Sequence, residues 1–166
     1  MITSRRNLDA VSDLDLREEP FDGPSAALLT AQVQQEYVVR YGGPDSTPVD
    51  RNEFAPPQGR FLVGYLDVEP VVMGGIRAID DETVEIKRMY VVPAVRGRGF
   101  ARVVLRRLEE LATEMGATRV VLETGLKQPE AMALYASAGY ERIENFGHYA
   151  GEALSASFGK SLAVVR

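Results

Sequence analysis

Cysteine is absent from this 166-residue chain, and His148 is its only histidine. Without cysteine there can be no disulfide, no thiolate metal site and no cysteine nucleophile. One histidine cannot form a histidine cluster for zinc, so we expect no metal centre. Apolar runs all fall short of the roughly 20 residues of a membrane helix. The residues around Arg5 and Arg6 lack the apolar stretch of a signal peptide. These features predict a soluble, cytoplasmic protein with no membrane partner.

The chain has fewer basic than acidic residues, with 19 Lys and Arg against 24 Asp and Glu, and its net charge is -5 at pH 7. This balance argues against nucleic acid as the main partner. Hydrophobic residues make up 45% of the chain, as in ordinary globular proteins. The length suits one core, so we expect residues 1–166 to form a single domain.

The periodicity of apolar residues predicts an alternation of strands and helices. Pro24 is placed as the first residue of a helix whose buried stripe is Leu29, Val33, Tyr37 and Tyr41. A second amphipathic helix follows Gly99 and ends at Gly116, and a third runs from Pro129 to Gly139. The predicted strands cover residues 14–17, 60–67, 71–79, 83–92, 118–124, 140–143 and 155–164.

This element order predicts an α+β layered fold with a mixed sheet. The unit from Thr83 to Thr124 should be a strand–helix–strand crossover with parallel strands. Strand 60–67 is apolar on both faces and should be central. Gly74-Gly75 within the next strand indicates a bulge or a close backbone approach.

The segment Arg96-Gly97-Arg98-Gly99 lies between a strand and a helix. Free N–H groups at the start of a helix, the helix dipole and arginine charge all favour a pyrophosphate there. Glycine lets the backbone approach a phosphate. The segment is not a Walker A loop, and Arg102 replaces the third glycine of a dinucleotide fingerprint. From the chemistry of the loop alone, the segment could equally be an ordinary helix start with surface arginines and no bound phosphate.

Three motifs resemble those of GNAT acetyltransferases. Arg96–Ala101 resembles the Arg/Gln-x-x-Gly-x-Gly/Ala signature, and Glu85–Pro93 resembles the strand before it. Ala131–Tyr140 is similar to a later helix with the pattern L-Y-x-x-x-G-F/Y. The close match spans Val84 to Ile143. The resemblance implies a mostly antiparallel mixed sheet of 6–7 strands, with a splayed parallel pair and flanking helices.

The same resemblance implies acetyl-CoA as co-substrate, with backbone groups around residues 89–91 holding the acyl and pantetheine part and residues 96–102 holding the pyrophosphate. Gln128 stands where many relatives have an asparagine that contacts pantetheine, although it could instead cap the helix opened by Pro129. The implied cofactor-binding residues are Met89, Tyr90, Val91, Arg96, Gly97, Arg98, Gly99, Phe100, Ala101, Arg102 and Gln128.

Tyr135 would protonate the departing thiolate, although a tyrosine before a glycine cap is often a core residue. The acceptor ammonium must lose a proton, and a carboxylate can take it. Glu85 and Glu123 both stand where members of the superfamily keep a base, and both would flank the splayed gap. The alternative for Glu85 is a cross-strand ion pair with Arg77. The alternative for Glu123 is a solvent-facing carboxylate.

By the same resemblance, the acceptor side would include Tyr37, Tyr41 and the segments 46–58 and 145–154. His148 could be a secondary base or a substrate contact there, although a lone loop histidine is more often simply exposed. Lacking a cysteine relay and a G-x-S-x-G elbow, the chain is expected to transfer acetyl directly to a primary amine in a ternary complex. A small-molecule acceptor is favoured. Acetylation of protein N-termini or lysines, or acyl-CoA binding without catalysis, are the alternatives. A homodimer is a common outcome in the family.

Overall fold

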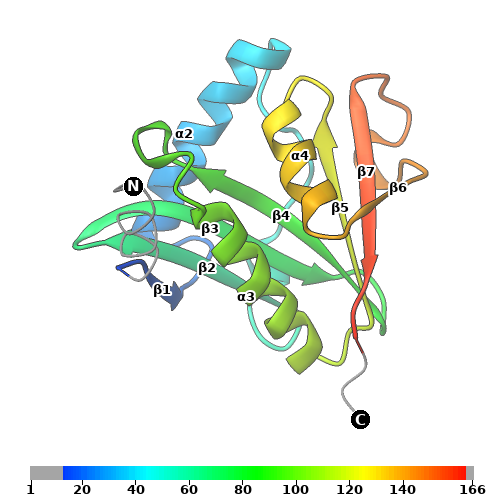
Figure 1. The fold of residues 1–166 in the computed structure, drawn as a ribbon, viewed down its shortest axis with the longest axis horizontal. Coiled ribbons are helices and arrows are strands. Elements are labelled where there is room, and N and C mark those ends of the chain that lie inside the picture. Colours follow the sequence, from blue (N-terminus) through cyan, green and yellow to red (C-terminus); the bar gives the residue numbers. More distant parts are fainter. Residues whose placement is uncertain (1–12, 164–166) are drawn as a thin grey trace, which may run out of the picture.

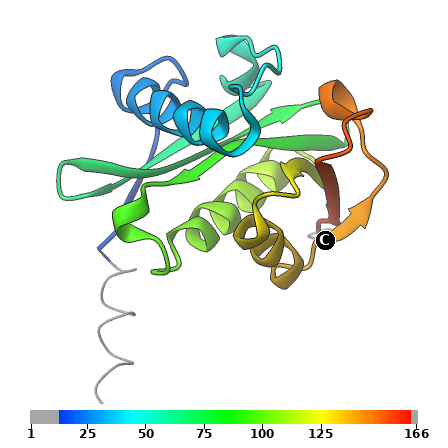
Figure 2. The same ribbon diagram turned by 90° about the horizontal axis from the view of Figure 1, so that it is seen from above.

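The computed structural model describes residues 13–163 of the chain, and Figures 1 and 2 show its fold. In this part of the chain, seven strands form one sheet in the order β1-β2-β3-β4-β5-β7-β6. The strands are β1 Asp15–Glu18, β2 Gly59–Leu66, β3 Glu69–Ala78, β4 Thr83–Val91, β5 Arg119–Gly125, β6 Glu141–Ile143 and β7 Ser155–Ser161. The helices are α2 Pro24–Tyr41, α3 Phe100–Glu114 and α4 Pro129–Ser137, with 3-10 turns η1 Arg51–Phe54, η2 Pro93–Val95 and η3 Gly147–Tyr149.

Helices cover both faces of the sheet. Figure 2 shows α2 above the sheet and α3 with α4 below it. All neighbouring strands pair antiparallel except β4 and β5, which are parallel. The predicted fold class and the parallel crossover are therefore confirmed. The last strand ends at Ser161 rather than at residue 164, and residues 164–166 lie outside the described part. No helix within residues 13–163 is long and apolar enough to cross a membrane.

Two hydrophobic clusters hold the layers together. The stripe of α3, which includes Val104, Leu105 and Leu108, is almost fully buried against the sheet. On the opposite face, Leu29 and Val33 of α2 pack in the second cluster. Each buried side chain of this size stabilises the fold by about 1.5–3 kcal/mol. Strand β2 is buried on both faces as predicted, although it lies second from the edge rather than in the centre of the sheet.

Strand β4 carries a bulge opposite Gly74. Met73 pairs with Tyr90 and Gly75 pairs with Lys87, so two residues of β4 face one residue of β3. One of those two is Arg88, whose φ of 62° is unusual for a residue with a side chain. The irregularity predicted at Gly74-Gly75 is present, but the extra residue lies on β4 and not on the strand that carries the two glycines.

The parallel pairing of β4 and β5 is short. It runs from Thr83 opposite Arg119 to Ile86 opposite Leu122 and then stops. Strand β5 stays paired with β7 as far as Gly125. Figure 1 shows β4 and β5 diverging beyond that point. The bulged half of β4 therefore has backbone groups with no partner on β5, at the position where the sheet opens.

A substitution at Gly59 tests the packing at the start of β2. A Cβ at Gly59 would overlap the carbonyl oxygens of Glu53 and Ile76, which are backbone atoms and cannot rotate away. We expect Gly59→Ala to lower the free energy of unfolding by about 2–3 kcal/mol, measured by urea unfolding. Gly151→Ala is the control, because a Cβ there meets no atom within 4 Å. Equal unfolding midpoints for the two variants would contradict this account.

Candidate active site

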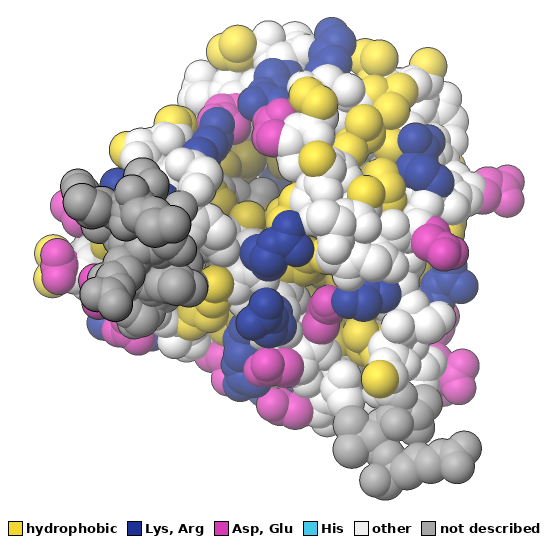
Figure 3. Space-filling model, viewed as in Figure 1, with side chains coloured by type: hydrophobic (Ala, Val, Ile, Leu, Met, Phe, Trp, Pro, Cys, Tyr) yellow, Lys and Arg dark blue, Asp and Glu magenta, His cyan; other side chains and the backbone are white. Residues whose placement is uncertain are grey.

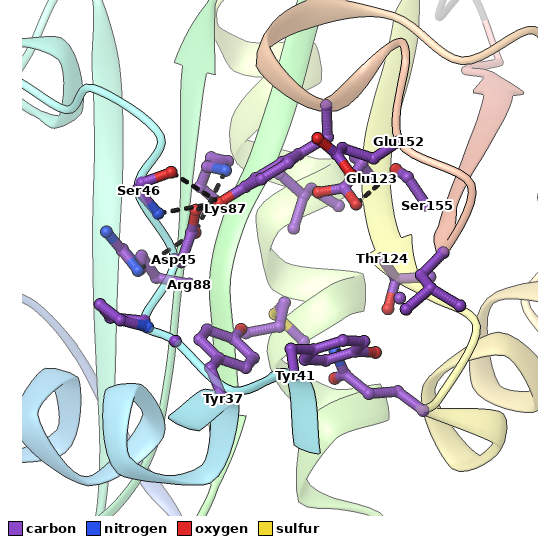
Figure 4. A pocket seen from close by; sticks show the side chains of 18 residues that line it. Tyr37, Tyr41, Asp45, Ser46, Lys87, Arg88, Glu123, Thr124, Glu152 and Ser155 are labelled. Atoms are coloured by element: carbon purple, nitrogen blue, oxygen red, sulfur yellow. Dashed lines mark hydrogen bonds and ion pairs between the residues drawn. The ribbon is translucent and has the colours of Figure 1, made fainter. Parts of the chain in front are cut away.

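A cavity of about 370 Å³ lies where β4 and β5 diverge (Figure 4). Its walls come from the end of α2, the loop after it, the bulge of β4, the end of β5 and the loop before β7. The lining residues are Tyr37, Tyr41, Gly43, Pro44, Asp45, Ser46, Ile86, Lys87, Arg88, Met89, Glu123, Thr124, Gly125, Gln128, Tyr149, Glu152, Leu154 and Ser155.

Asp45 is the centre of one wall. Its Oδ1 accepts hydrogen bonds from the Tyr149 hydroxyl at 2.6 Å and from the backbone N–H and hydroxyl of Thr47 at 2.9 and 2.7 Å. Its Oδ2 lies 3.6 Å from Lys87 Nζ and 3.3 Å from Arg88 Nη1. Burial alone would raise the pKa of Asp45, but the Lys87 charge and the hydrogen bonds hold it at about 2. Asp45 is therefore ionised at neutral pH.

Glu123 lies across the cavity from Asp45, as Figure 4 shows. It comes from the part of β5 beyond the last residue paired with β4, and the Ser155 hydroxyl donates to its Oε1 at 2.6 Å. Burial raises the pKa of Glu123 above its usual value, and the charges of Asp45 and Glu85 add to the rise against Ser155 and Lys87. A carboxylate with a raised pKa in a cavity is suited to accept a proton near neutral pH.

Glu85 does not line the cavity, so the prediction that both glutamates flank the gap is wrong for this residue. It sits opposite Val121, within the part of β4 that is still paired with β5. Its carboxylate is held by Arg77, its cross-strand neighbour on β3, at 3.1 Å. The ion pair predicted as the alternative for Glu85 is present, and Arg77 also pairs with Glu53.

Tyr37 and Tyr41, for which the acceptor side was predicted, form a third side of the cavity (Figure 4). The Tyr41 hydroxyl lies against Gly125, where a Cβ would overlap it. Gln128 donates from Nε2 to the same hydroxyl at 3.3 Å. The side chain of Gln128 therefore reaches the cavity and does not cap α4. Burial raises the pKa of Tyr37 far above its usual value, so this hydroxyl stays protonated.

Two loops meet at the edge of the cavity. Tyr149, in η3, accepts from the backbone N–H of Ser46 at 2.8 Å through its hydroxyl, in addition to its bond with Asp45. His148 is exposed and does not line the cavity, but its Nε2 lies 3.1 Å from the Ser46 hydroxyl. His148 therefore contacts the loop after α2, and its role as a substrate contact stays a prediction.

Tyr135 is a buried core residue of α4 and does not line the cavity. Its ring packs against Tyr140 and Phe158, with centroid distances of 5.8 and 6.2 Å. Burial raises the pKa of the Tyr135 hydroxyl, and nearby Tyr37 and Glu123 raise it further. The hydroxyl is therefore protonated at neutral pH, as a proton donor must be.

The loop from Arg96 to Arg102 presents a row of free backbone N–H groups. Within residues 13–163, no protein acceptor pairs with the N–H groups of residues 97–102. Gly97 and Gly99 have φ of 82° and 87°, and a Cβ at Gly97 would meet no atom within 4 Å. The space before the loop is open. Figure 3 shows the surface hollowed between α2 and α4, with Lys and Arg side chains around its rim.

The arginines of this loop differ in their contacts. Arg96 donates from Nε to the carbonyl of Val91 at 2.9 Å and pairs with Glu36. Arg102 donates to the Ser137 hydroxyl at 2.6 Å, which ties α3 to α4. Arg98 is exposed. Two of the three predicted phosphate-binding arginines therefore already have protein partners in the structure.

The other predicted cofactor-binding residues lie on β4 and at the start of α3. Met89 lines the cavity, and its sulfur packs where a Cβ of Gly74 would be. Tyr90 is buried under α2, and Val91 is half-buried. Phe100 is buried in the core and Ala101 is half-buried. The predicted cofactor contacts use only the backbone groups of these residues. Burial of their side chains is therefore compatible with the prediction.

Sequence reasoning missed Asp45, Lys87 and Arg88, although Ser46 and Tyr149 fall within the segments 46–58 and 145–154 predicted for the acceptor side. Lys87 and Arg88 did carry a signal, because two adjacent cations stand between apolar residues of one strand. Asp45 carried none, since it follows Gly-Gly-Pro in a segment typical of a loop. Ser155 was recognised only as the start of a strand.

Comparison with known proteins identifies the family. A sequence model of the acetyltransferase (GNAT) family matches residues 30–140. The chain is 38% identical to the IAA acetyltransferase of Azospirillum brasilense over 154 residues, 88% of this chain and 95% of the relative. A structure from Klebsiella pneumoniae, assigned as an acyl-CoA N-acyltransferase, superposes with a TM-score of 0.76 at 25% identity, over 90% of this chain and 98% of that one. A GNAT family acetyltransferase from Elizabethkingia anophelis with acetyl-CoA bound has a TM-score of 0.64 at 15% identity, over 90% and 99% of the chains. The chain therefore belongs to the GNAT family of acetyltransferases.

Proposed function

We propose that this chain transfers an acetyl group from acetyl-CoA directly to the primary amine of a small molecule, and that residues 1–166 form one catalytic domain. The row of free N–H groups at residues 97–102 carries the proposal. It lies at the start of α3, where the helix dipole favours an anion. A Cβ at Gly97 would meet no atom within 4 Å, so no side chain covers the backbone at this position. A structural neighbour of the same fold has acetyl-CoA bound.

The acetyl group would lie between the bulge of β4 and the end of β5. N–H groups at the bulge would stabilise the oxyanion that develops on the carbonyl. Glu123 takes the proton from the acceptor ammonium, directly or through a water. The amine nitrogen then attacks the carbonyl carbon and forms the C–N bond. As the tetrahedral intermediate collapses, the nitrogen loses its second proton to water and the C–S bond breaks. Tyr135 gives its phenol proton to the departing thiolate and regains a proton from solvent.

The closed edge of the cavity favours a small acceptor over a protein chain. Tyr149 bridges the loop before β7 to Asp45 and Ser46, more than 100 residues away in sequence, through hydrogen bonds of 2.6 and 2.8 Å. The cavity volume, about 370 Å³, falls at the lower end of the range for small-molecule sites. Positioning of two bound substrates would supply much of the rate.

Calorimetric titration with acetyl-CoA tests the cofactor assignment. We expect Gly97→Asp to weaken binding about 100-fold, since it places a carboxylate before the free N–H groups, a loss of about 2.7 kcal/mol. Gly116→Asp is the matched control, because Gly116 also has a positive φ of 86° and open space but lies at the far end of α3. Equal affinity of both variants, or no binding by the unmodified protein, would overturn the assignment.

A further inference from the structure

Two buried cations line the cavity and share one carboxylate. Lys87 and Arg88 have side chains that are 7% and 6% exposed, and the Asp45 side chain is 13% exposed. Each cation lies within 4 Å of Asp45 Oδ2. Glu123 is not within 4 Å of either cation, although it lines the same cavity. The group formed by Lys87, Arg88 and Asp45 therefore carries one net positive charge.

The hydrogen bonds of this group are also incomplete. Oδ1 of Asp45 is occupied by Tyr149 and Thr47, so only Oδ2 is left for the cations, at 3.3 and 3.6 Å. Lys87 has one further acceptor, the Thr47 hydroxyl at 3.2 Å. The guanidinium of Arg88 offers five N–H donors. Among the described residues its one acceptor is Asp45, and its Nε is buried without a partner.

Burying a charge without enough opposite charge and hydrogen-bond acceptors costs free energy. An anion bound in the cavity would supply both to Lys87 and Arg88. The net charge of one fits a monoanion such as a carboxylate, whose two oxygens match a guanidinium. Across the cavity, Glu123 offers the complementary negative charge (Figure 4). The cavity thus has one wall for an anion and an opposite wall for an ammonium.

We propose that the acceptor is an amino acid, whose carboxylate binds at Lys87 and Arg88 and whose amino group faces Glu123. This inference rests on the proposed function, since it names the class of amine that would be acetylated. Tyr37 and Tyr41 then lie beside the substrate on the third side of the cavity.

Matched pairs of ligands test the inference. The proteinogenic L-amino acids, β-alanine and 4-aminobutyrate are each compared with their carboxamides, which keep the amine and lose the carboxylate. Binding to the CoA-saturated protein is measured by calorimetry, and turnover with acetyl-CoA is measured by thiol release. For at least one amino acid, we expect both the affinity and the kcat/KM to be at least 10-fold higher than for its carboxamide.

Lys87→Met should reduce that preference, because Arg88 and Asp45 then carry no net charge and one of the two cations that bind the carboxylate is lost. Arg106→Met is the control. It also removes one positive charge, but Arg106 is exposed on α3 and does not line the cavity. A preference that is undiminished in Lys87→Met, or turnover of carboxamides and amino acids at equal rates, would overturn the inference. Carboxylate-dependent binding without thiol release would support it while refuting the proposed acetyl transfer.

Discussion

Replacing Glu123 with glutamine is expected to lower kcat by about 10²- to 10⁴-fold, the usual contribution of a general base. The amide oxygen of glutamine can still accept the hydrogen bond from Ser155, which lies 2.6 Å from Oε1 in the structure. The shape of the cavity and the affinity for acetyl-CoA should therefore be unchanged. Steady-state thiol release and calorimetry with acetyl-CoA measure the two quantities separately.

The pH dependence supplies a second measurement on the same variant. Glu123 acts as a base only when it is ionised, and burial raises its pKa above 4.5. The rate of the unmodified enzyme should therefore fall as the pH drops through that raised pKa. This acid limb should be missing from Glu123→Gln, whose residual rate should follow only the ionisation of the amine. A limb of identical position in both proteins would exclude Glu123 as its source.

Glu85→Gln is the matched control for the choice of base. Glu85 is ion-paired with Arg77 and lies outside the cavity. We expect its kcat to stay within a few-fold of the unmodified enzyme, while the free energy of unfolding falls because Arg77 loses one of its two carboxylate partners. A large loss of kcat in Glu85→Gln together with a small one in Glu123→Gln would reverse the assignment.

Asp45→Asn is expected to lower the free energy of unfolding by about 3 kcal/mol, because it leaves two buried cations without a counterion. Lys87 and Arg88 both lie within 4 Å of Asp45 Oδ2 and are almost fully buried. Urea unfolding followed by circular dichroism measures the change. Asp15→Asn is the control, because Asp15 pairs with Arg17 at a surface where both side chains are more than half exposed. It should change stability by less than about 1 kcal/mol.

The depressed pKa of Asp45 sets the sign of the pH effect. A carboxyl with a pKa of about 2 in the folded state contributes stability that is present above its unfolded pKa and is lost as the pH falls toward 2. The unmodified protein should therefore lose stability between about pH 4 and pH 2 more steeply than Asp45→Asn does. Parallel stability curves in this range would contradict the buried ion pairs.

Local sequence signals predicted most of the fold. The 3.6-residue periodicity of α3 and the glycine at position 116 placed that helix correctly, because its stripe is the part buried against the sheet. The pair Gly74-Gly75 predicted the irregularity for a steric reason that the structure confirms, since Met89 occupies the space of a side chain at Gly74. Element ends differ by one to three residues, as at Ser161, where no change in the apolar pattern marks the end.

The acceptor wall could not be predicted in the same way, because its contacts join distant segments. Asp45 meets Lys87 through the packing of the loop after α2 on β4, and meets Tyr149 from the loop before β7. No local pattern specifies these distances. The choice between Glu85 and Glu123 was open for a similar reason: it depends on where the pairing of β4 with β5 stops, which is one residue after Glu85, at Ile86.

The bulge at Arg88 also determines which kinds of mutation β4 can tolerate. Before it, Glu85 and Lys87 point toward the face covered by α2, and after it Tyr90 does so, because one extra residue has shifted the alternation. A substitution in this strand changes one side chain, but a deletion of one residue between Lys87 and Tyr90 would remove the bulge itself. Tyr90 would keep its place in the α2 cluster, but β4 would then pair regularly with β3 where the cavity now has the extra residue. During divergence from a common ancestor, the chain length between Ile86 and Gly97 should therefore be held constant even where the residues themselves vary.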